Sequence, residues 1–238
     1  MKDNQTQVTN TNQTLDKDQK SFRDSVLQEE ADRRSARITK EFTAAFTYIK
    51  HSEKSVSFFG SARFRPTSEH YKQARRLAER IVKETGYAVV TGGGPGIMEA
   101  ANRGAKESGG TSIGLNITLP HEQIKNSFLT ESLDFYYFFS RKVALSFSAE
   151  AYIFFPGGFG TLDEFFELIT LVQTEKLPRV PIILMGSDFW KPLDTFILRQ
   201  LYNAHKSIDL ADMNIYSITD SEDEVIEVIK KAPVRTEE

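Results

Sequence analysis

The stretch Ala151–Leu168 constrains the fold of this chain more than any other part of it. Its sequence, AYIFFPGGFGTLDEFFEL, begins with an apolar, aromatic-rich run that is typical of a fully buried strand. Pro156 and three glycines interrupt that run, and an acidic amphipathic helix opens at Thr161. The sequence therefore predicts a strand, a glycine loop and a helix in direct succession.

The glycine loop has the features of an anion site. Gly157, Gly158 and Gly160 carry no Cβ, so the backbone can turn sharply and lie against a ligand. The first N–H groups of the following helix lack acceptors within the helix and lie at the positive end of its dipole. Such a site most often holds phosphate. A glycine-rich turn without a ligand is the alternative, because a single glycine motif is weak evidence.

Strand and helix patterns alternate along the chain from residue 51 onward. Apolar runs predict strands at 55–60, 87–91, 111–117, 133–139, 151–155, 180–185 and 215–218. Amphipathic runs predict helices at 71–84, from Met98, from Ser140, from Thr161, at 189–204 and at 222–231. Repeated units of this kind predict an α/β, Rossmann-like, doubly wound parallel sheet with helices on both faces.

Three of the predicted strands are followed by glycine-containing loops that could bind a ligand, at 60–63, 92–96 and 156–161. In parallel sheets, ligands bind where the loops at the carboxyl ends of neighbouring strands face each other. We therefore expect these three loops to open onto the same edge of the sheet.

The N-terminal part of the chain differs from the rest. Residues 1–20 are almost devoid of large apolar side chains and are predicted to be a disordered tail. Apolar residues recur at helical spacing within 21–50, which predicts a helical arm that docks on the domain or on a partner subunit. Residues 51–238 are predicted to be one domain.

Composition excludes several classes of function. A net charge of −3 gives no basic field for a nucleic acid, so we expect no nucleic-acid partner. The chain has no cysteine, which excludes disulfides and thiolate chemistry, and its four histidines are scattered, so no metal site is predicted. No apolar run is long enough to span a bilayer. We expect no membrane partner and a cytoplasmic location.

Two common nucleotide motifs are absent. Neither GGGPGIM nor GGFGTL matches G-x-G-x-x-G, and no acidic residue follows where a dinucleotide fold needs one. No Gly-Lys-Ser/Thr follows a glycine cluster either. A mononucleotide phosphate therefore remains as the candidate ligand.

Charged residues flank the predicted site. Arg141 and Lys142 follow Ser140, a plausible N-cap, at a helix start where the dipole opposes cations. In the functional interpretation, a ligand or a catalytic acid offsets this cost. In the structural alternative, the charged end of each side chain extends to water or pairs with a nearby carboxylate. Asp163 and Glu167 are explained by the dipole alone, whereas a functional Glu164 should face a sugar, because a carboxylate binds hydroxyls well.

The aromatic run Phe135–Phe139 has two interpretations. It could offer a stacking surface for a base, but five consecutive aromatic residues cannot all face one pocket. A buried strand or a subunit contact is the favoured interpretation.

Together these motifs resemble the LONELY GUY (LOG) family of phosphoribohydrolases. GGGPGIMEAANRGA from Gly92, SRK from Ser140 and PGGFGTLDE from Pro156 carry the resemblance, and PGGFGTLDE fits the family signature P-G-G-x-G-T-x-x-E. The resemblance covers residues from about Val56 to at least Trp190. The label lysine decarboxylase is often attached to similar sequences, but nothing in this one supports pyridoxal chemistry.

The resemblance implies roles for individual residues. Arg141 and Glu164 fall on the catalytic pair, and the phosphate loop falls on Gly157, Gly158, Gly160 and Thr161. The second glycine loop falls on Gly93, Gly94 and Gly96, and the ligand-facing turn after the first strand falls on Ser61 and Arg63. Both members of the catalytic pair are expected to face solvent and ligand rather than the core.

The resemblance also implies an activity. It is hydrolysis of the N-glycosidic bond of nucleoside 5′-monophosphates, AMP-like or cytokinin riboside monophosphates, to free base and ribose 5-phosphate, without a cofactor and in a homodimer or larger homo-oligomer. The rival hypothesis is a non-catalytic nucleotide or molybdenum-cofactor carrier on the same scaffold. Retention of Arg141 and Glu164 favours the enzyme, since a carrier needs the phosphate loop but no catalytic pair.

Overall fold

The computed structural model describes residues 4–51, 54–118 and 125–233. Residues 1–3 of the predicted tail and 119–124, which follow the third predicted strand, lie outside the described residues. The chain divides into two compact units, Met1–Ala44 and Ala45–Glu238.

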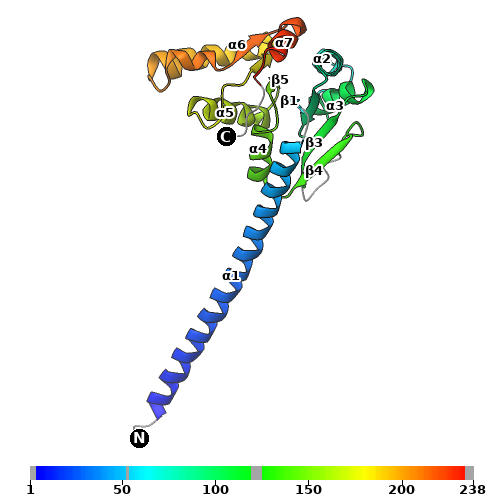
Figure 1. Cartoon of the computed structure of the whole chain (residues 1–238). Helices are drawn as coiled ribbons and strands as arrows, with labels where there is room; N and C mark the ends of the chain where they lie inside the picture. The colour runs from blue at the N-terminus through cyan, green and yellow to red at the C-terminus, as the bar shows by residue number, and fades with distance from the viewer. Residues whose placement is uncertain (1–3, 52–53, 119–124, 234–238) are drawn as a thin grey trace. The chain divides into compact units, whose positions relative to one another are not determined.

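The second unit is built on one sheet of seven parallel strands in the order β4-β3-β2-β1-β5-β6-β7 (Figure 1). The strands are β1 (Ser55–Phe59), β2 (Ala88–Thr91), β3 (Ser112–Ile117), β4 (Glu131–Phe135), β5 (Ala151–Phe154), β6 (Ile182–Met185) and β7 (Ser217–Thr219). The order runs outward from β1 in one direction and from β5 in the other. The predicted doubly wound α/β sheet is confirmed, with its reversal point between β1 and β5.

Helices cover both faces of the sheet. They are α2 (Glu69–Thr85), α3 (Ile97–Glu107), α4 (Phe138–Ser146), α5 (Phe159–Gln173), α6 (Ser187–Phe196), which continues as a π-helix (Ile197–Ala204), a 3-10 turn (Leu210–Asn214) and α7 (Glu222–Lys230). Alternate strand residues contribute to two separate buried clusters. One cluster joins α2, α3 and α7 to the sheet, and the other joins α4, α5 and α6 to its opposite face.

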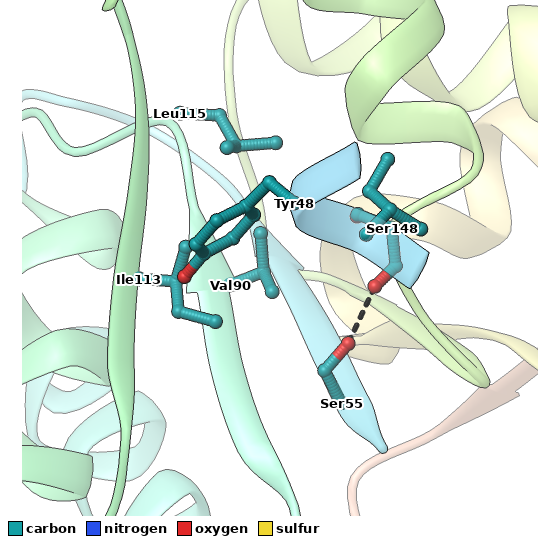
Figure 2. Close-up of a pocket in the computed structure, with 7 residues that line it drawn as sticks. Tyr48, Ser55, Val90, Ile113, Leu115 and Ser148 are labelled. Atoms are coloured by element: carbon teal, nitrogen blue, oxygen red, sulfur yellow. Dashed lines mark hydrogen bonds between the residues drawn. The ribbon is translucent and has the colours of Figure 1, made fainter. Parts of the chain in front are cut away.

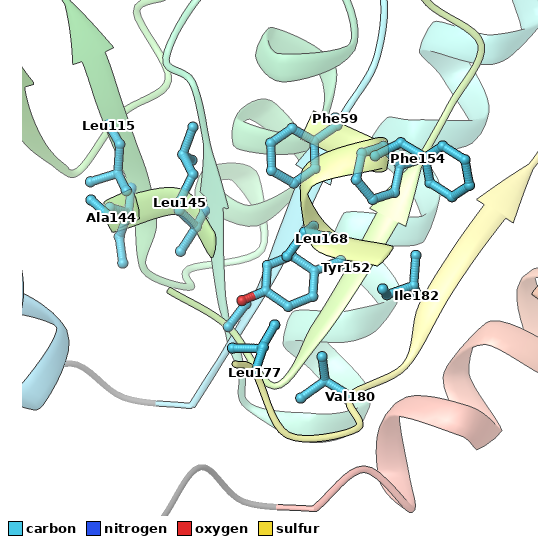
Figure 3. Close-up of a cluster of buried hydrophobic side chains, with 14 of the residues drawn as sticks. Phe59, Leu115, Ala144, Leu145, Tyr152, Phe154, Leu168, Leu177, Val180 and Ile182 are labelled. Atoms are coloured by element: carbon cyan, nitrogen blue, oxygen red, sulfur yellow. The ribbon is translucent and has the colours of Figure 1, made fainter. Parts of the chain in front are cut away.

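The cluster on the α5 face is rich in aromatic side chains. Figure 3 shows Phe59, Tyr152 and Phe154 of the central strands with Leu168 of α5 and Leu145 of α4. The rings of Phe59 and Phe154, on the adjacent strands β1 and β5, stack with centroids 4.7 Å apart. This packing fixes the two strands whose carboxyl ends carry the first and third predicted loops.

The first helix, α1, spans Asn4–His51 and so crosses the boundary between the two units. The sequence predicts a disordered tail up to residue 20, whereas the helix in the structure begins at Asn4. Few large apolar residues do not prevent a helix, because no Gly or Pro interrupts residues 4–20 and Gln and Lys have favourable helix propensities. The division into tail, arm and domain stays a prediction.

The end of α1 belongs to the second unit. Figure 2 shows Tyr48 beside Val90, Ile113 and Leu115 of the sheet, and its hydroxyl lies 2.5 Å from a carboxylate oxygen of Glu131 in β4. The last turn of α1 therefore packs against the sheet face that also carries α4 and α5.

The aromatic run divides differently from the prediction. β4 ends at Phe135, which is buried, and α4 begins at Phe138, with Tyr137 rather than Ser140 as its N-cap. A single strand through Phe139 is therefore wrong, as is the Ser140 cap. Apolar composition alone does not tell a strand from the first turn of a helix.

Among the described residues, no helix combines the length and the apolar character that crossing a membrane requires. No group of three or more potential ligand side chains in this part of the chain could hold a metal ion.

The contact between α2 and α3 depends on Gly104. A Cβ at this position would lie 2.1 Å from the carbonyl oxygen of Arg75 in α2, which is backbone that cannot rotate away. At Gly160, in the first turn of α5, a Cβ would meet no atom within 4 Å.

We predict that Gly104→Ala lowers the free energy of unfolding by roughly 1–3 kcal/mol, because the two helices must move apart. Gly160→Ala is the matched control and should be neutral or stabilising by up to about 1 kcal/mol, since alanine favours helix. Urea unfolding of both variants tests this. Equal stability of Gly104→Ala and the parent would contradict the close approach.

Candidate active site

A cleft of about 910 Å³ opens at the carboxyl edge of the sheet, where the strand order reverses between β1 and β5. Its walls come from the loops after β1, β2 and β5 and from α4 and α5. Residues that line it include Gly60, Ser61, Ala62, Arg63, Gly92, Met98, Arg141, Lys142, Pro156, Gly157, Gly158, Gly160, Thr161 and Glu164. The prediction that three loops share one edge is confirmed.

The N-terminus of α5 forms one end of the cleft. The first helical hydrogen bond of α5 runs from the amide of Leu162 to the carbonyl of Gly158, at 3.1 Å, so the amides of the three preceding residues have no acceptor within the helix. A Cβ at Gly157 would lie 2.1 Å from Oγ1 of Thr161, whereas one at Gly158 would enter open space. Gly157 thus lets the loop close on Thr161, and Gly158 leaves room beside the amides for an anion.

The loop after β1 is tied to the loop after β5. The amide of Ser61 donates to the carbonyl of Pro156 at 3.0 Å, and its carbonyl accepts from the amide of Ile97 at 3.1 Å. Its hydroxyl accepts from the amide of Arg63 at 3.1 Å. Ser61 is therefore at the junction of all three loops, and the predicted pair Ser61 and Arg63 lies on the cleft wall.

The second glycine loop contributes a different residue from those predicted. Gly92 lines the cleft, while Gly93, Gly94 and Gly96 do not. Gly93 has φ +71° and a Cβ there would lie 1.8 Å from Oδ1 of Asn116, so it makes the turn possible. Gly96 also has φ +71°, and a Cβ there would lie 2.2 Å from the carbonyl oxygen of Ser61. These glycines shape the loop from behind the wall, and a direct ligand contact for them stays a prediction.

Buried side chains hold this second loop. Oγ1 of Thr91 accepts from the amide of Gly93 at 2.9 Å and donates to Oδ1 of Asn102 at 2.6 Å. The amide nitrogen of the Asn126 side chain donates to the carbonyl of Gly94 at 3.1 Å and to Oδ1 of Asn102 at 2.9 Å. The network fixes the loop without entering the cleft.

Arg141, the fourth residue of α4, reaches under the loops. Its Nε donates to the carbonyl of Leu115 at 2.7 Å and its Nη2 to the carbonyl of Gly92 at 3.3 Å. Burial lowers the pKa of Arg141, and the charge of Glu164 works against that shift. The guanidinium keeps its charge at any working pH. Backbone carbonyls and a carboxylate thus offset the placement of this cation near a helix start.

Glu164 is buried at the other side of the cleft, with 9% of its surface exposed. Burial raises its pKa to about 7, Lys142 and Arg141 oppose that shift, and Glu167 and Asp163 add to it. A carboxyl group with a pKa near neutrality changes its charge within the range where enzymes work. Glu164 therefore has the electrostatic character of a functional acid or base.

Arg141 and Glu164 are expected to face solvent and ligand rather than the core. Both line the cleft, but Glu164 is more buried than that expectation implies, with 9% of its surface exposed. Helical spacing places it near the start of α5 but does not reveal that α4 covers that turn. The structure does bring the two predicted catalytic residues to the same cleft.

Several lining residues escaped the sequence analysis. Phe138, Phe159 and Phe189 come from α4, α5 and α6, and all three have exposed rings, Phe159 to 93%. Phe189 could have been found, because it follows β6 at the same edge as the other loops. Phe138 could not, since it depends on where β4 ends.

Burial of Glu164 makes a prediction about stability. Its pKa is raised in the folded state, so the folded protein binds the proton more tightly and loses stability as the pH rises from about 4.5 to about 7. We compare the change in unfolding free energy that Glu164→Gln causes at two pH values. This change should be more stabilising at pH 8 than at pH 5, by about 1–3 kcal/mol. Urea unfolding at both pH values measures this difference.

The exposed Glu69 of α2 supplies the control. Glu69→Gln should change stability little at either pH, because an exposed ion pair contributes weakly. If the effect of Glu164→Gln is the same at pH 5 and pH 8, the carboxyl group does not titrate near neutrality.

Comparison with known proteins places this geometry in context. A family model described as "Possible lysine decarboxylase" matches residues 98–229. The chain is 26% identical over 158 residues to a cytokinin riboside 5'-monophosphate phosphoribohydrolase of Rhodococcoides fascians, covering 65% of this chain and 79% of that protein. It is 32% identical over 138 residues to a probable enzyme of the same name from Oryza sativa subsp. japonica, covering 56% of this chain and 55% of that protein.

Solved structures show the same fold. The molybdenum cofactor carrier protein of Chlamydomonas reinhardtii superposes with a TM-score of 0.57 at 20% identity, over 75% of this chain and 98% of that one. The molybdenum cofactor binding protein of Rippkaea orientalis superposes with a TM-score of 0.54 at 23% identity, over 75% of this chain and 97% of that one. At these identities, the likeness is one of architecture.

Proposed function

Because the chain belongs to the LOG family, whose model carries the description possible lysine decarboxylase, we propose that it hydrolyses the N-glycosidic bond of nucleoside 5′-monophosphates. The products are a free base and ribose 5-phosphate. The observation that carries the proposal is the placement of Arg141 and Glu164 in one cleft with the open N-terminus of α5.

The 5′-phosphate would bind at the α5 N-terminus. The amides of Phe159, Gly160 and Thr161 are available there, and the helix dipole favours a dianion. Binding energy at this end of the substrate fixes the sugar in the cleft without taking part in bond breaking. The phosphate is thus the anchor of the substrate.

Glu164 would act at the ribose. Glycosidic cleavage passes through an oxocarbenium-like state, in which the C1′–N bond breaks, its electron pair leaves with the base, and the sugar becomes positive. The ionised Glu164 carboxylate binds ribose hydroxyls, stabilises that positive charge and orients the water that attacks C1′. Arg141 supports the leaving base or the phosphate, since its charge is permanent.

The family label and the carrier hypothesis fit the cleft less well. A decarboxylase that uses pyridoxal needs a lysine amine to form a Schiff base. Lys142, the lysine that the described cleft wall presents, is ion-paired with Asp163 and Glu167 instead. A carrier would need no carboxyl group with a pKa near 7 beside the phosphate site. Both features favour hydrolysis.

We predict that the protein converts AMP and water to adenine and ribose 5-phosphate, and that kcat/KM for adenosine is at least about 100-fold lower, a loss of roughly 2.7 kcal/mol. Glu164→Gln should lower AMP turnover by a factor of at least about 10² to 10³, in the range for removal of one charged stabilising group. Chromatography of both substrates, with and without chelator, measures this.

The outcomes separate the hypotheses. Equal cleavage of adenosine and AMP would contradict the phosphate anchor. If no purine or pyrimidine monophosphate releases its base, tight binding of a nucleotide or of molybdenum cofactor would favour the carrier.

We also propose a homodimer or larger homo-oligomer. Exposed aromatic side chains gather where β4 passes into α4, with Tyr136, Phe138 and Phe139 exposed to 55%, 59% and 47%. A second copy of the chain would bury them. Light scattering at micromolar concentration should give a multiple of 27.0 kDa, and a monomer would refute the proposal.

A further inference from the structure

Lys142 joins α4 to α5 at the wall of the cleft, and neither the sequence motifs nor the proposed reaction assigns it a task. Its Nζ lies 2.7 Å from Oδ2 of Asp163 and 3.0 Å from Oε2 of Glu167. The side chain of Lys142 is 21% exposed. Asp163 and Glu167 are four residues apart, so they lie on one face of α5. Lys142 therefore bridges one turn of α5, and this turn carries Glu164.

The pairing of Lys142 is tighter than that of a typical surface lysine. Burial lowers its pKa, but hydrogen bonds to Asp163 and Glu167 outweigh burial and raise the pKa above its usual value. Oε2 of Glu167 is buried and accepts no hydrogen bond with good geometry among the described residues, so the ammonium charge is what compensates it. Loss of Lys142 would leave this oxygen without compensation.

The charges around Glu164 depend on the same lysine. Arg141 and Lys142 approach from α4, and Asp163 and Glu167 lie on α5 itself. With Glu164 ionised, the group contains three negative charges and two positive ones. Lys142 contributes the largest of the favourable interactions with the Glu164 carboxylate. Without Lys142, a single cation of this group would face three carboxylates.

One more charged group lines the cleft. Arg63, in the loop after β1, is exposed and makes its interaction with Ser61 through the backbone amide. Its guanidinium lies in a solvated environment, which screens its effect on a buried carboxyl group. Lys142, which is half-buried and paired with two carboxylates of α5, is therefore better placed than Arg63 to affect the charge of Glu164.

We propose, on the basis of the proposed hydrolysis, that Lys142 is a positioning residue, which holds the Asp163–Glu167 turn of α5 against α4 and keeps the Glu164 carboxylate ionised for its role at the ribose. The ammonium group of Lys142 already pairs with two carboxylates, those of Asp163 and Glu167. Lys142 therefore acts through Glu164 rather than on the substrate. An ion pair that only joined α4 to α5 could lie on any turn of α5. The pairs made by Lys142 instead lie on the turn that carries the buried Glu164.

The direct test is a titration that does not need turnover. In protein with ¹³C-labelled glutamate side chains, NMR follows the carboxyl carbon of Glu164, which is identified by its absence in Glu164→Gln. The parent should titrate near pH 7. Lys142→Met should raise the midpoint by about one pH unit, because a nearby positive charge is lost. Lys142→Arg should restore it, since the charge returns.

Three further variants complete the test. Lys72→Met is the matched control, because Lys72 also makes a 2.7 Å pair with a carboxylate, Glu69, but on α2 away from the cleft, and it should leave the midpoint unchanged. Asp163→Asn removes a 60% exposed carboxylate whose negative charge opposes ionisation of Glu164, so it should lower the midpoint. Lys142→Gln removes the same positive charge as Lys142→Met and keeps the proposal testable if Lys142→Met does not fold.

Activity provides the second readout. In the pH dependence of kcat with AMP, Lys142→Met should move the limb that reports Glu164 to higher pH by the same amount as in NMR. A folded Lys142→Met with an unchanged Glu164 midpoint would overturn the proposal, as would a uniform loss of activity at every pH. Failure of the parent to cleave AMP would contradict the proposed function alone, because the NMR midpoints do not depend on turnover.

Discussion

A backbone hydrogen bond from the amide of Ser61 to the carbonyl of Pro156 joins the two loops between which the cleft opens. The strands that lead into these loops, β1 and β5, pair in parallel at the point where the sheet order reverses. Because one loop turns toward α5 and the other toward α2, the bond at Ser61 is what keeps their tips together. The other groups in the site are placed relative to this junction.

The cleft holds charges of both signs, and their arrangement follows the chemistry proposed for it. The α5 amides supply positive potential without a side chain, so an anion can bind there although acidic residues begin only two positions later. Arg141 obtains its position from carbonyls of β3 and of the loop after β2. Glu164 is thus buried near cations that are themselves fixed. Burial raises the pKa of its carboxyl group, and these cations oppose that rise.

The sequence predicts much of this architecture, for a physical reason. Strands buried on both faces are continuous apolar runs, so their ends can be read directly, and the loops that follow them must share an edge. This logic found Ser61 and the Pro156–Thr161 loop. It could not tell Gly92 from its neighbours, because the turn at Gly93 depends on the approach of Asn116 from β3.

Other parts of the site depend on contacts that local patterns do not encode. Burial of Glu164 requires α4 to lie across α5, and the partners of Lys142 are more than twenty residues away from it in the sequence. The aromatic residues after Phe135 could equally continue a strand or start a helix, and only the packing decides. Tertiary contacts, rather than propensity, therefore determine which charged groups work together.

The wide spacing of β1 and β5 along the chain has a consequence for biosynthesis. Ser55 and Ser57, at the start of the central strand, bond to Glu150 and Ser148, which are more than ninety residues downstream. A chain emerging from the ribosome exposes one edge of β1 until β5 has been made, and closing such a long loop is slow. The Pro156–Thr161 loop follows β5 directly, so the nascent protein gains its cleft in the same step that hides the exposed edge from other chains.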